Sequence, residues 1–70
     1  MIKKGIYRHY KGGRYEVIGV AKHSESLEEM VVYRALYGEG GLWVRPASMW
    51  NEWVEKDGQK VLRFTLEEAL

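Results

Sequence analysis

Apolar and polar residues alternate along most of the chain in short runs, which glycine or proline separates. Short runs rich in β-branched and aromatic residues are typical of β-strands. The pattern predicts five or six antiparallel strands in an all-β fold. Their expected ranges are Ile6–Tyr10, Arg14–Lys22, Glu29–Tyr37, Leu42–Arg45, Trp50–Glu55 and Lys60–Thr65.

Glycine and proline mark the connections. Gly12-Gly13 and Asp57-Gly58 suit tight hairpin turns, because glycine tolerates the positive φ that these turns need. Gly19, in the middle of a strand, indicates a bulge or a close packing contact. Pro46 cannot donate to a strand ladder, so we expect one short helical turn near 46–49.

Two segments are also compatible with helix. Leu27, Met30, Val31 and Ala35 have helical spacing, but residues 30–33 are β-branched and aromatic, which slightly favours a strand. A longer helix, from the turn at Pro46 to Lys56, is the alternative to the strand expected at 50–55. The tail 66–70 can add a helical turn but has little to anchor it.

The chain of 70 residues is expected to form a single domain, residues 1–70. A domain of this size buries only about 60% of its unfolded surface. Because it has no cysteine, no disulfide can compensate, and its aromatic residues must supply much of the core. Short strands at these intervals predict a small closed or half-open barrel. The long strand 14–22 has two largely apolar rows, which indicates burial on both faces.

Charge and termini narrow the function classes. Through His23 the chain has six basic residues and one acid, and the remainder has five and nine. The excess of basic residues in the first third is too small to form the basic stripe expected of a dedicated nucleic-acid binder. The N-terminus has no apolar run, so we expect no signal peptide, no membrane span and a cytoplasmic location.

Four blocks have a recognisable order and spacing over nearly the whole chain: residues 5–12, 15–25, 32–38 and 42–46. They resemble the bacterial domain-of-unknown-function family 1653 (DUF1653). The resemblance implies an SH3-like barrel, a strand at 29–37, and no established activity, cofactor or catalytic residue. The chain departs from the family pattern at Trp50, where phenylalanine is expected, and in its tail.

Several motifs invite a catalytic or metal-binding interpretation. His9, His23 and Glu25 form a loose candidate metal trio, but structural histidines at strand ends are the favoured interpretation. Ser24 and His23 are adjacent on an extended segment and point to opposite sides, so they do not form a nucleophile–base pair. The loop 38–41 is rich in glycine but lacks the Lys-Ser/Thr of a phosphate loop. We therefore predict no catalytic residue, no metal and no cofactor.

Arg34 and Arg45 interrupt apolar stretches, so each must pair, stack or reach water. A structural role is favoured, with Glu16 as a partner and the guanidinium stacked on Trp43 or a tyrosine. The alternative is an anion site lined by both arginines.

The favoured function is a non-catalytic module that binds a protein, peptide or small anionic ligand. A nucleic-acid module that uses the basic first third, an accessory subunit of an enzyme, and a homodimer joined through the tryptophans are the alternatives. Exposed aromatic rings are candidates for recognition: Tyr7, Tyr10, Tyr37, Trp43 and Trp50. The expected binding patch is Tyr7, His9, Arg34, Tyr37, Trp43 and Arg45.

Overall fold

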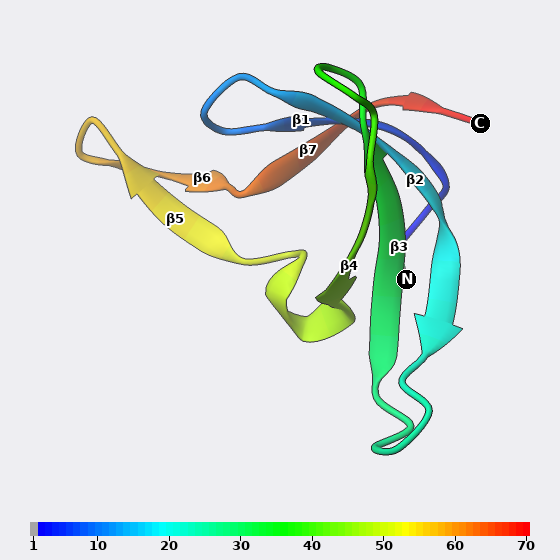
Figure 1. The fold of residues 1–70 in the computed structure, drawn as a ribbon. Helices are drawn as coiled ribbons and strands as arrows, with labels where there is room; N and C mark the ends of the chain where they lie inside the picture. The colour runs from blue at the N-terminus through cyan, green and yellow to red at the C-terminus, as the bar shows by residue number, and fades with distance from the viewer. Residues whose placement is uncertain (1) are drawn as a thin grey trace.

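The computed structural model describes residues 2–70, which form two antiparallel sheets (Figure 1). The larger sheet has five strands in the order β4-β3-β2-β1-β7, and the smaller one pairs β5 with β6. A 3₁₀ turn, η1 (Ala47–Met49), lies between the last strand of one sheet and the first strand of the other, β4 and β5. The strands are β1 (Gly5–His9), β2 (Arg14–Lys22), β3 (Glu29–Ala35), β4 (Leu42–Pro46), β5 (Trp53–Lys56), β6 (Gln59–Leu62) and β7 (Phe64–Ala69).

The predicted all-β class is confirmed, with antiparallel strands and one helical turn at the expected place. The segment 29–35 is a strand and not a helix. The barrel is open, because the β5–β6 hairpin does not pair with the five-stranded sheet. In Figure 1 the hairpin extends away from the sheet beneath the end of β1 and β2.

The predicted turns form because the local sequence supplies the required backbone conformations. Asp57 and Gly58 both have positive φ, at 52° and 78°, which is the geometry of a tight two-residue hairpin. Gly12 has a φ of 110° in the β1–β2 turn. The bulge predicted at Gly19 is confirmed, since the β2–β3 register shifts between Val17 and Gly19.

The core lies on one face of the five-stranded sheet and is mainly aromatic. Trp50 is fully buried, and its ring stacks on Phe64 with centroids 3.8 Å apart and planes 3° apart. Tyr7 and Tyr33 meet Trp50 edge-on, at centroid distances of 5.4 and 5.0 Å. Four of the seven buried hydrophobic residues among residues 2–70 are thus aromatic, and their large rings suit a short chain without cysteine.

Three expectations about the strands are wrong. The strand expected at 50–55 begins at Trp53, because Trp50 ends the 3₁₀ turn and turns inward to the core. The strand expected at 60–65 breaks at Arg63, so the chain has seven strands in all among residues 2–70. Strand β2 is not buried on both faces, since Val17 is its only buried residue and Val20, Ala21 and Lys22 are exposed.

The tail is a strand, not a helical turn. Strand β7 pairs with β1, and the amide of Leu70 donates to the carbonyl of Lys4 at 3.1 Å. Gly5 makes this pairing possible, because a Cβ atom there would overlap the carbonyl oxygen of Glu68. Gly5 also has a φ of 156°, which other residues rarely adopt. Residues at the opposite end of the sequence, Lys4 and Gly5, thus anchor the tail.

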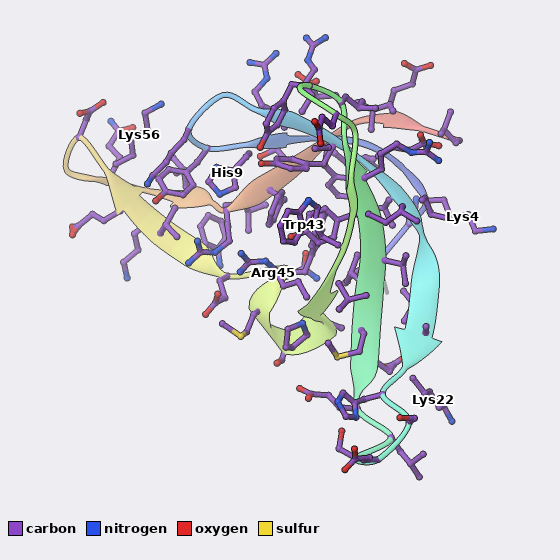
Figure 2. All side chains as sticks on the ribbon, in the orientation of Figure 1. Lys4, His9, Lys22, Trp43, Arg45 and Lys56 are labelled. Carbon is purple, nitrogen blue, oxygen red and sulfur yellow. The ribbon has the colours of Figure 1, made fainter. Side chains whose placement is uncertain are left out.

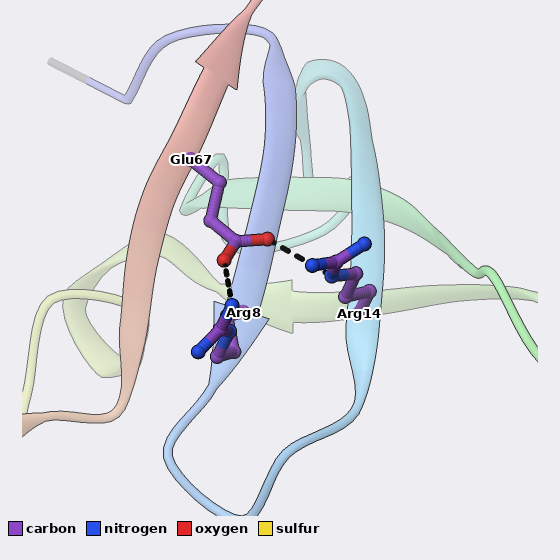
Figure 3. A network of polar contacts seen from close by, with 3 residues as sticks. All are labelled: Arg8, Arg14 and Glu67. Carbon is purple, nitrogen blue, oxygen red and sulfur yellow. Dashed lines mark ion pairs between the residues drawn. The ribbon is translucent and has the colours of Figure 1, made fainter.

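An ion-pair network joins three strands on the outer face of the larger sheet (Figure 3). The carboxylate of Glu67 in β7 forms ion pairs with Arg8 of β1 at 2.5 Å and with Arg14 of β2 at 3.0 Å. Both arginines are more than half exposed, so each pair adds little stability, about 0–1 kcal/mol. Two of the basic residues of the first third of the chain thus share one carboxylate, which offsets one of their two charges.

Candidate functional site

The candidate site lies on the inner face of the larger sheet, beside the aromatic core. In the β3–β4 register Val31 is opposite Arg45 and Tyr33 is opposite Trp43. Opposite residues share a face, so Trp43 and Arg45 point to the same side as the buried Val31 and Tyr33. Figure 2 shows Trp43 and Arg45 on this side, with His9 toward the β5–β6 hairpin. We call the following group the Arg45 site: His9, Tyr15, Tyr37, Trp43, Arg45 and Arg63.

Backbone hydrogen bonds hold the smaller sheet against the end of β1. The amide of Tyr10 donates to the carbonyl of Arg63 at 2.9 Å, and the amide of Arg63 donates to Glu52 at 2.8 Å. The ammonium group of Lys56 donates to the carbonyl of Tyr10 at 3.0 Å. Arg63 is therefore fixed next to the end of β1, close to His9.

Arg45 lies between the core and solvent. Its guanidinium carbon is 5.7 Å from the centroid of the Phe64 ring, within the range of a cation–π contact. Its Nε atom is shielded from solvent and has no hydrogen-bond partner among residues 2–70. A buried donor without a hydrogen-bond partner lowers the stability of a protein by about 1–3 kcal/mol, and by more if the donor is charged. Arg45 therefore has donor capacity that the described residues do not use.

An open groove of about 350 Å³ lies alongside Arg45. Trp43 is 61% exposed at this groove, so its ring is available for contact. The lining residues are Tyr33, Trp43, Val44, Arg45, Pro46 and Met49. The groove combines an apolar wall with one guanidinium, the usual composition of a site for a partly apolar ligand.

His9 reports the electrostatic character of the site. Burial lowers the pKa of His9 below its ordinary value, and the nearby cations Arg63, Lys11 and Arg45 lower it further. The Nδ1 atom accepts a hydrogen bond from the amide of Lys11 at 3.1 Å, which requires the neutral ring. In this tautomer Nε2 carries the proton and is a donor. The surroundings of His9 are therefore positively charged and rich in donors.

Two tyrosine hydroxyls form one side of the site. The hydroxyls of Tyr15 and Tyr37 are 2.6 Å apart and share a hydrogen bond. Burial and this bond raise the pKa of Tyr15 to about 12. Because one hydroxyl donates to the other, the accepting hydroxyl keeps its own proton as a donor.

The structure separates the six residues of the predicted patch. His9, Tyr37, Trp43 and Arg45 belong to the Arg45 site. Tyr7 is only 6% exposed, because its ring packs in the core and its hydroxyl donates to the carbonyl of Lys3 at 2.7 Å. Trp50 is likewise a core residue and offers no surface for recognition.

Arg34 lies on the opposite face of the sheet from Arg45. It is opposite Glu16 in the β2–β3 register, and its Nε lies 3.8 Å from the Glu16 carboxylate. The predicted Arg–Glu pair is confirmed, and an anion site lined by both arginines is excluded by their opposite directions. Arg45 contacts Phe64, where stacking on Trp43 or a tyrosine was expected.

Sequence reasoning missed Tyr15 and Arg63 as members of the site. Tyr15 lies in an apolar row of the strand at 14–22, which by itself predicts only burial. The alternation of β2 identifies the face of Tyr15 once the face of Val17 is known. Arg63 was placed inside a strand that the structure breaks there. No local signal identifies that break, because it depends on hydrogen bonds to Tyr10 and Glu52.

The two histidines are far apart, so the trio of His9, His23 and Glu25 does not form. They flank opposite ends of the β1–β2 hairpin, roughly 30 Å apart at the rise of a strand. The Nδ1 atom of His23 accepts from the amides of Glu25 and Ser26, so it stabilises its own turn. Residues 2–70 contain no cluster of three metal-ligating side chains of the histidine, cysteine or carboxylate type.

A second groove, of about 520 Å³, lies near the N-terminal segment and η1. Lys4 and Glu29, two of its lining residues, carry opposite charges. None of the shielded polar atoms that lack a partner belongs to a residue that lines it. Nothing in this groove indicates a particular ligand, so the Arg45 site is the stronger candidate.

Comparisons with known proteins place the chain among proteins of unknown function. The family model described as "Protein of unknown function (DUF1653)" matches residues 5–66. A crystal structure of a protein belonging to this family from Bordetella bronchiseptica is similar, with 35% identity and a TM-score of 0.90. The match covers 99% of this chain and 91% of that one. No curated protein matches the chain. No helix in residues 2–70 has the length and apolar character to cross a membrane.

Proposed function

This chain belongs to the DUF1653 family, and we propose that it is a non-catalytic binding module whose Arg45 site takes the anionic group of a peptide or small ligand. The observation that carries the proposal is the Nε atom of Arg45, which is shielded from water and has no partner among the described residues. A carboxylate or phosphate oxygen is the acceptor that a guanidinium binds most strongly.

The charge around Arg45 supports an anion as the ligand. Arg45, Arg63 and Lys11 are close enough to His9 to lower its pKa. Glu52 offsets one of them, since its carboxylate lies 3.4 Å from Nε of Arg63. The balance remains positive, and the Phe64 ring beneath Arg45 limits access of water, which strengthens a charge-assisted hydrogen bond.

The exposed ring of Trp43 supports a ligand that also has an apolar part. A flat ring at the edge of a groove gives contact area at low entropic cost, which is why tryptophan is frequent in recognition sites. In this proposal Arg45 orients the anionic group, and Trp43 packs against the adjoining apolar group.

Nucleic acid is a less suitable ligand, because the basic residues of the first third are spread out. Arg8 and Arg14 pair with Glu67 on the outer face. Lys4 and Lys22 are far from His9 in Figure 2. These cations do not form the continuous stripe that tracks a phosphate backbone.

The non-catalytic character of the proposal has two supports. The family description names no activity. Among the residues of the Arg45 site, His9 has the side chain best suited to act as a general base. However, its pKa is lowered, and its Nδ1 atom already accepts a hydrogen bond from the Lys11 amide. A general base works best with a pKa near the operating pH and a free lone pair toward its substrate.

The proposal can be tested by NMR titration with N-acetylglutamate, inorganic phosphate and acetate. We expect saturable shifts of the amides of residues 43–45 and 63, with dissociation constants of about 1–10 mM for so small a contact. Arg45→Gln should abolish the response, and Arg34→Gln, which alters the arginine on the opposite face, should leave it intact. Equal loss in both variants, or no saturable response to any of the anions, would contradict the proposal.

A further inference from the structure

Strand β4 is the outermost strand of the larger sheet and has a free long edge. It pairs only with β3 among the described strands. The amide of Ala35 donates to Gly41 at 3.3 Å, which makes these two residues a hydrogen-bonded pair. Such pairs alternate along an antiparallel ladder, so Trp43 and Arg45 bond to β3. The amide and carbonyl groups of Leu42 and Val44 therefore point away from the sheet.

The position of Pro46 agrees with this pattern. Pro46 is opposite Met30, a pair that the alternation leaves without hydrogen bonds between the strands. A proline in an edge strand directs its missing donor away from the ladder. The outer edge of β4 thus offers amides at Leu42 and Val44 and carbonyls at Leu42, Val44 and Pro46.

This edge is apolar and, within residues 2–70, little protected. Leu42, Trp43 and Val44 are 65%, 61% and 60% exposed. Natural sheets usually shield an edge with charged residues, bulges or a covering loop. The other edge, β7, has such charges in Glu67 and Glu68, and β4 has none before Arg45. An exposed edge of this kind is a template for addition of a strand.

We propose that an extended acidic segment of a partner protein adds to β4 as an antiparallel strand. This inference rests on the proposed function, because the acidic side chain is the anion that the Arg45 site takes. The residue opposite Arg45 would be Asp or Glu, with its Cβ about 4.5–5.5 Å from that of Arg45. Two residues later, on the same face, a tyrosine, phenylalanine or leucine would pack on Trp43.

The antiparallel direction fixes the order of this motif. Read from the N-terminus of the partner, the acidic residue comes first, any residue follows opposite Val44, and the apolar residue comes third. The amide and carbonyl of Val44 both point outward. The middle residue of the partner, which lies opposite Val44, therefore exchanges two backbone hydrogen bonds with it.

A second copy of this chain fits the edge less well. Strand β4 has the sequence Leu-Trp-Val-Arg-Pro, which contains no acidic residue. A second β4 would add another arginine to an already positive face and would leave the Nε atom of Arg45 without a carboxylate. Charge complementarity therefore favours an acidic partner over self-association.

The test uses the whole chain and the blocked pentapeptide Ac-Thr-Glu-Val-Tyr-Thr-NH₂. We expect saturable binding, with slower hydrogen exchange of the Leu42 and Val44 amides and little change at Trp43, whose amide already bonds to β3. Replacement of the glutamate by glutamine should weaken binding about tenfold, the effect of one charge-assisted hydrogen bond. N-methylation of the central valine of the peptide removes the amide that would donate to Val44. It should abolish binding, and it leaves the protein itself unaltered.

The outcomes separate this inference from the proposed function. Binding of N-acetylglutamate without protection of Leu42 and Val44 by the peptide would overturn strand addition and leave the anion site standing. If neither N-acetylglutamate nor the peptide binds, both the strand addition and the anion site are overturned. Equal affinity for the glutamine peptide, or for a peptide with the motif reversed, would overturn the recognition of an ordered acidic motif. Light scattering that shows a dimer with these two amides protected before peptide is added would assign the edge to a second copy.

Discussion

The guanidinium of Arg45 lies 5.7 Å from the centroid of the Phe64 ring. Phe64 in turn stacks on Trp50 at 3.8 Å, in the middle of the core. The Arg45 site is therefore built directly on the residues that hold the fold together. This arrangement limits the movement of the arginine, which lowers the entropic cost of binding a ligand.

Trp50→Ala should destabilise the protein severely. Removal of a fully buried aromatic ring costs about 3–5 kcal/mol. That is much of the total stability of about 4–10 kcal/mol expected of a 70-residue domain. Trp50→Phe should cost less, because the indole Nε1 has no hydrogen-bond partner to lose among residues 2–70.

Urea denaturation followed by far-ultraviolet circular dichroism measures both changes. Trp53→Ala is the matched control, since Trp53 is 65% exposed and should change the unfolding free energy by about 0.5 kcal/mol or less. A larger effect at Trp53 than at Trp50 would show that the core has been assigned to the wrong tryptophan.

Gly5→Ala should destabilise the pairing of β1 with β7. A methyl group at Gly5 would overlap the carbonyl of Glu68, and its φ of 156° is strained for alanine. We expect a loss of about 1–3 kcal/mol. Gly19→Ala is the control, because the nearest atom to an added Cβ there is 4.0 Å away, at the end of Lys4. Equal effects, or no loss of protection of the Leu70 amide in the first variant, would contradict this account.

His9 should titrate below the ordinary histidine value in a proton NMR experiment. Burial is the main cause, followed by Arg63, so Arg63→Gln should raise the pKa without fully restoring it. Because the pKa is lower in the folded state than in the unfolded state, the unfolded chain binds more protons as the pH falls through about 6.5. The contribution of His9 to stability is complete above this pH and is lost below it. A folded-state pKa above that of a model peptide would contradict this assignment.

Tyr15 should ionise only in strongly alkaline solution. Its pKa of about 12 results mainly from burial and then from the hydrogen bond with Tyr37. Since the folded-state pKa is raised above 10, stability is complete below pH 10 and falls as the pH rises toward 12. Tyr37→Phe should lower the pKa of Tyr15, as measured by ultraviolet absorbance of tyrosinate. Tyr10→Phe is a control that leaves the bonded pair intact.

The fold was largely predictable, because turns are encoded locally. Gly12-Gly13 and Asp57-Gly58 supply the backbone conformations that hairpins need, and the segments between them have the alternation of strands. The tail was not predictable in this way. Its pairing depends on a close approach to Gly5, a contact between the two ends of the sequence.

The site was only partly predictable, because residue type does not determine which face of a strand is buried. Arg34 and Arg45 both interrupt apolar runs, yet the β3–β4 register places them on opposite faces. Tyr7 and Tyr37 are chemically alike, but one is in the core and the other is exposed. The register and the covering of one face by Trp50 decide these outcomes, and both are tertiary features.

The most direct test of the central claim is the ¹⁵N–¹H signal of the Arg45 Nε group during titration with the acidic pentapeptide. We expect a saturable downfield proton shift with the same dissociation constant as the backbone shifts of β4, because a shielded donor gains a carboxylate acceptor. The corresponding signal of Arg34, on the outer face, should not move. An Arg45 signal that stays fixed while the peptide binds, or that moves no more than the signal of Arg34, would contradict the claim that this arginine recognises the ligand.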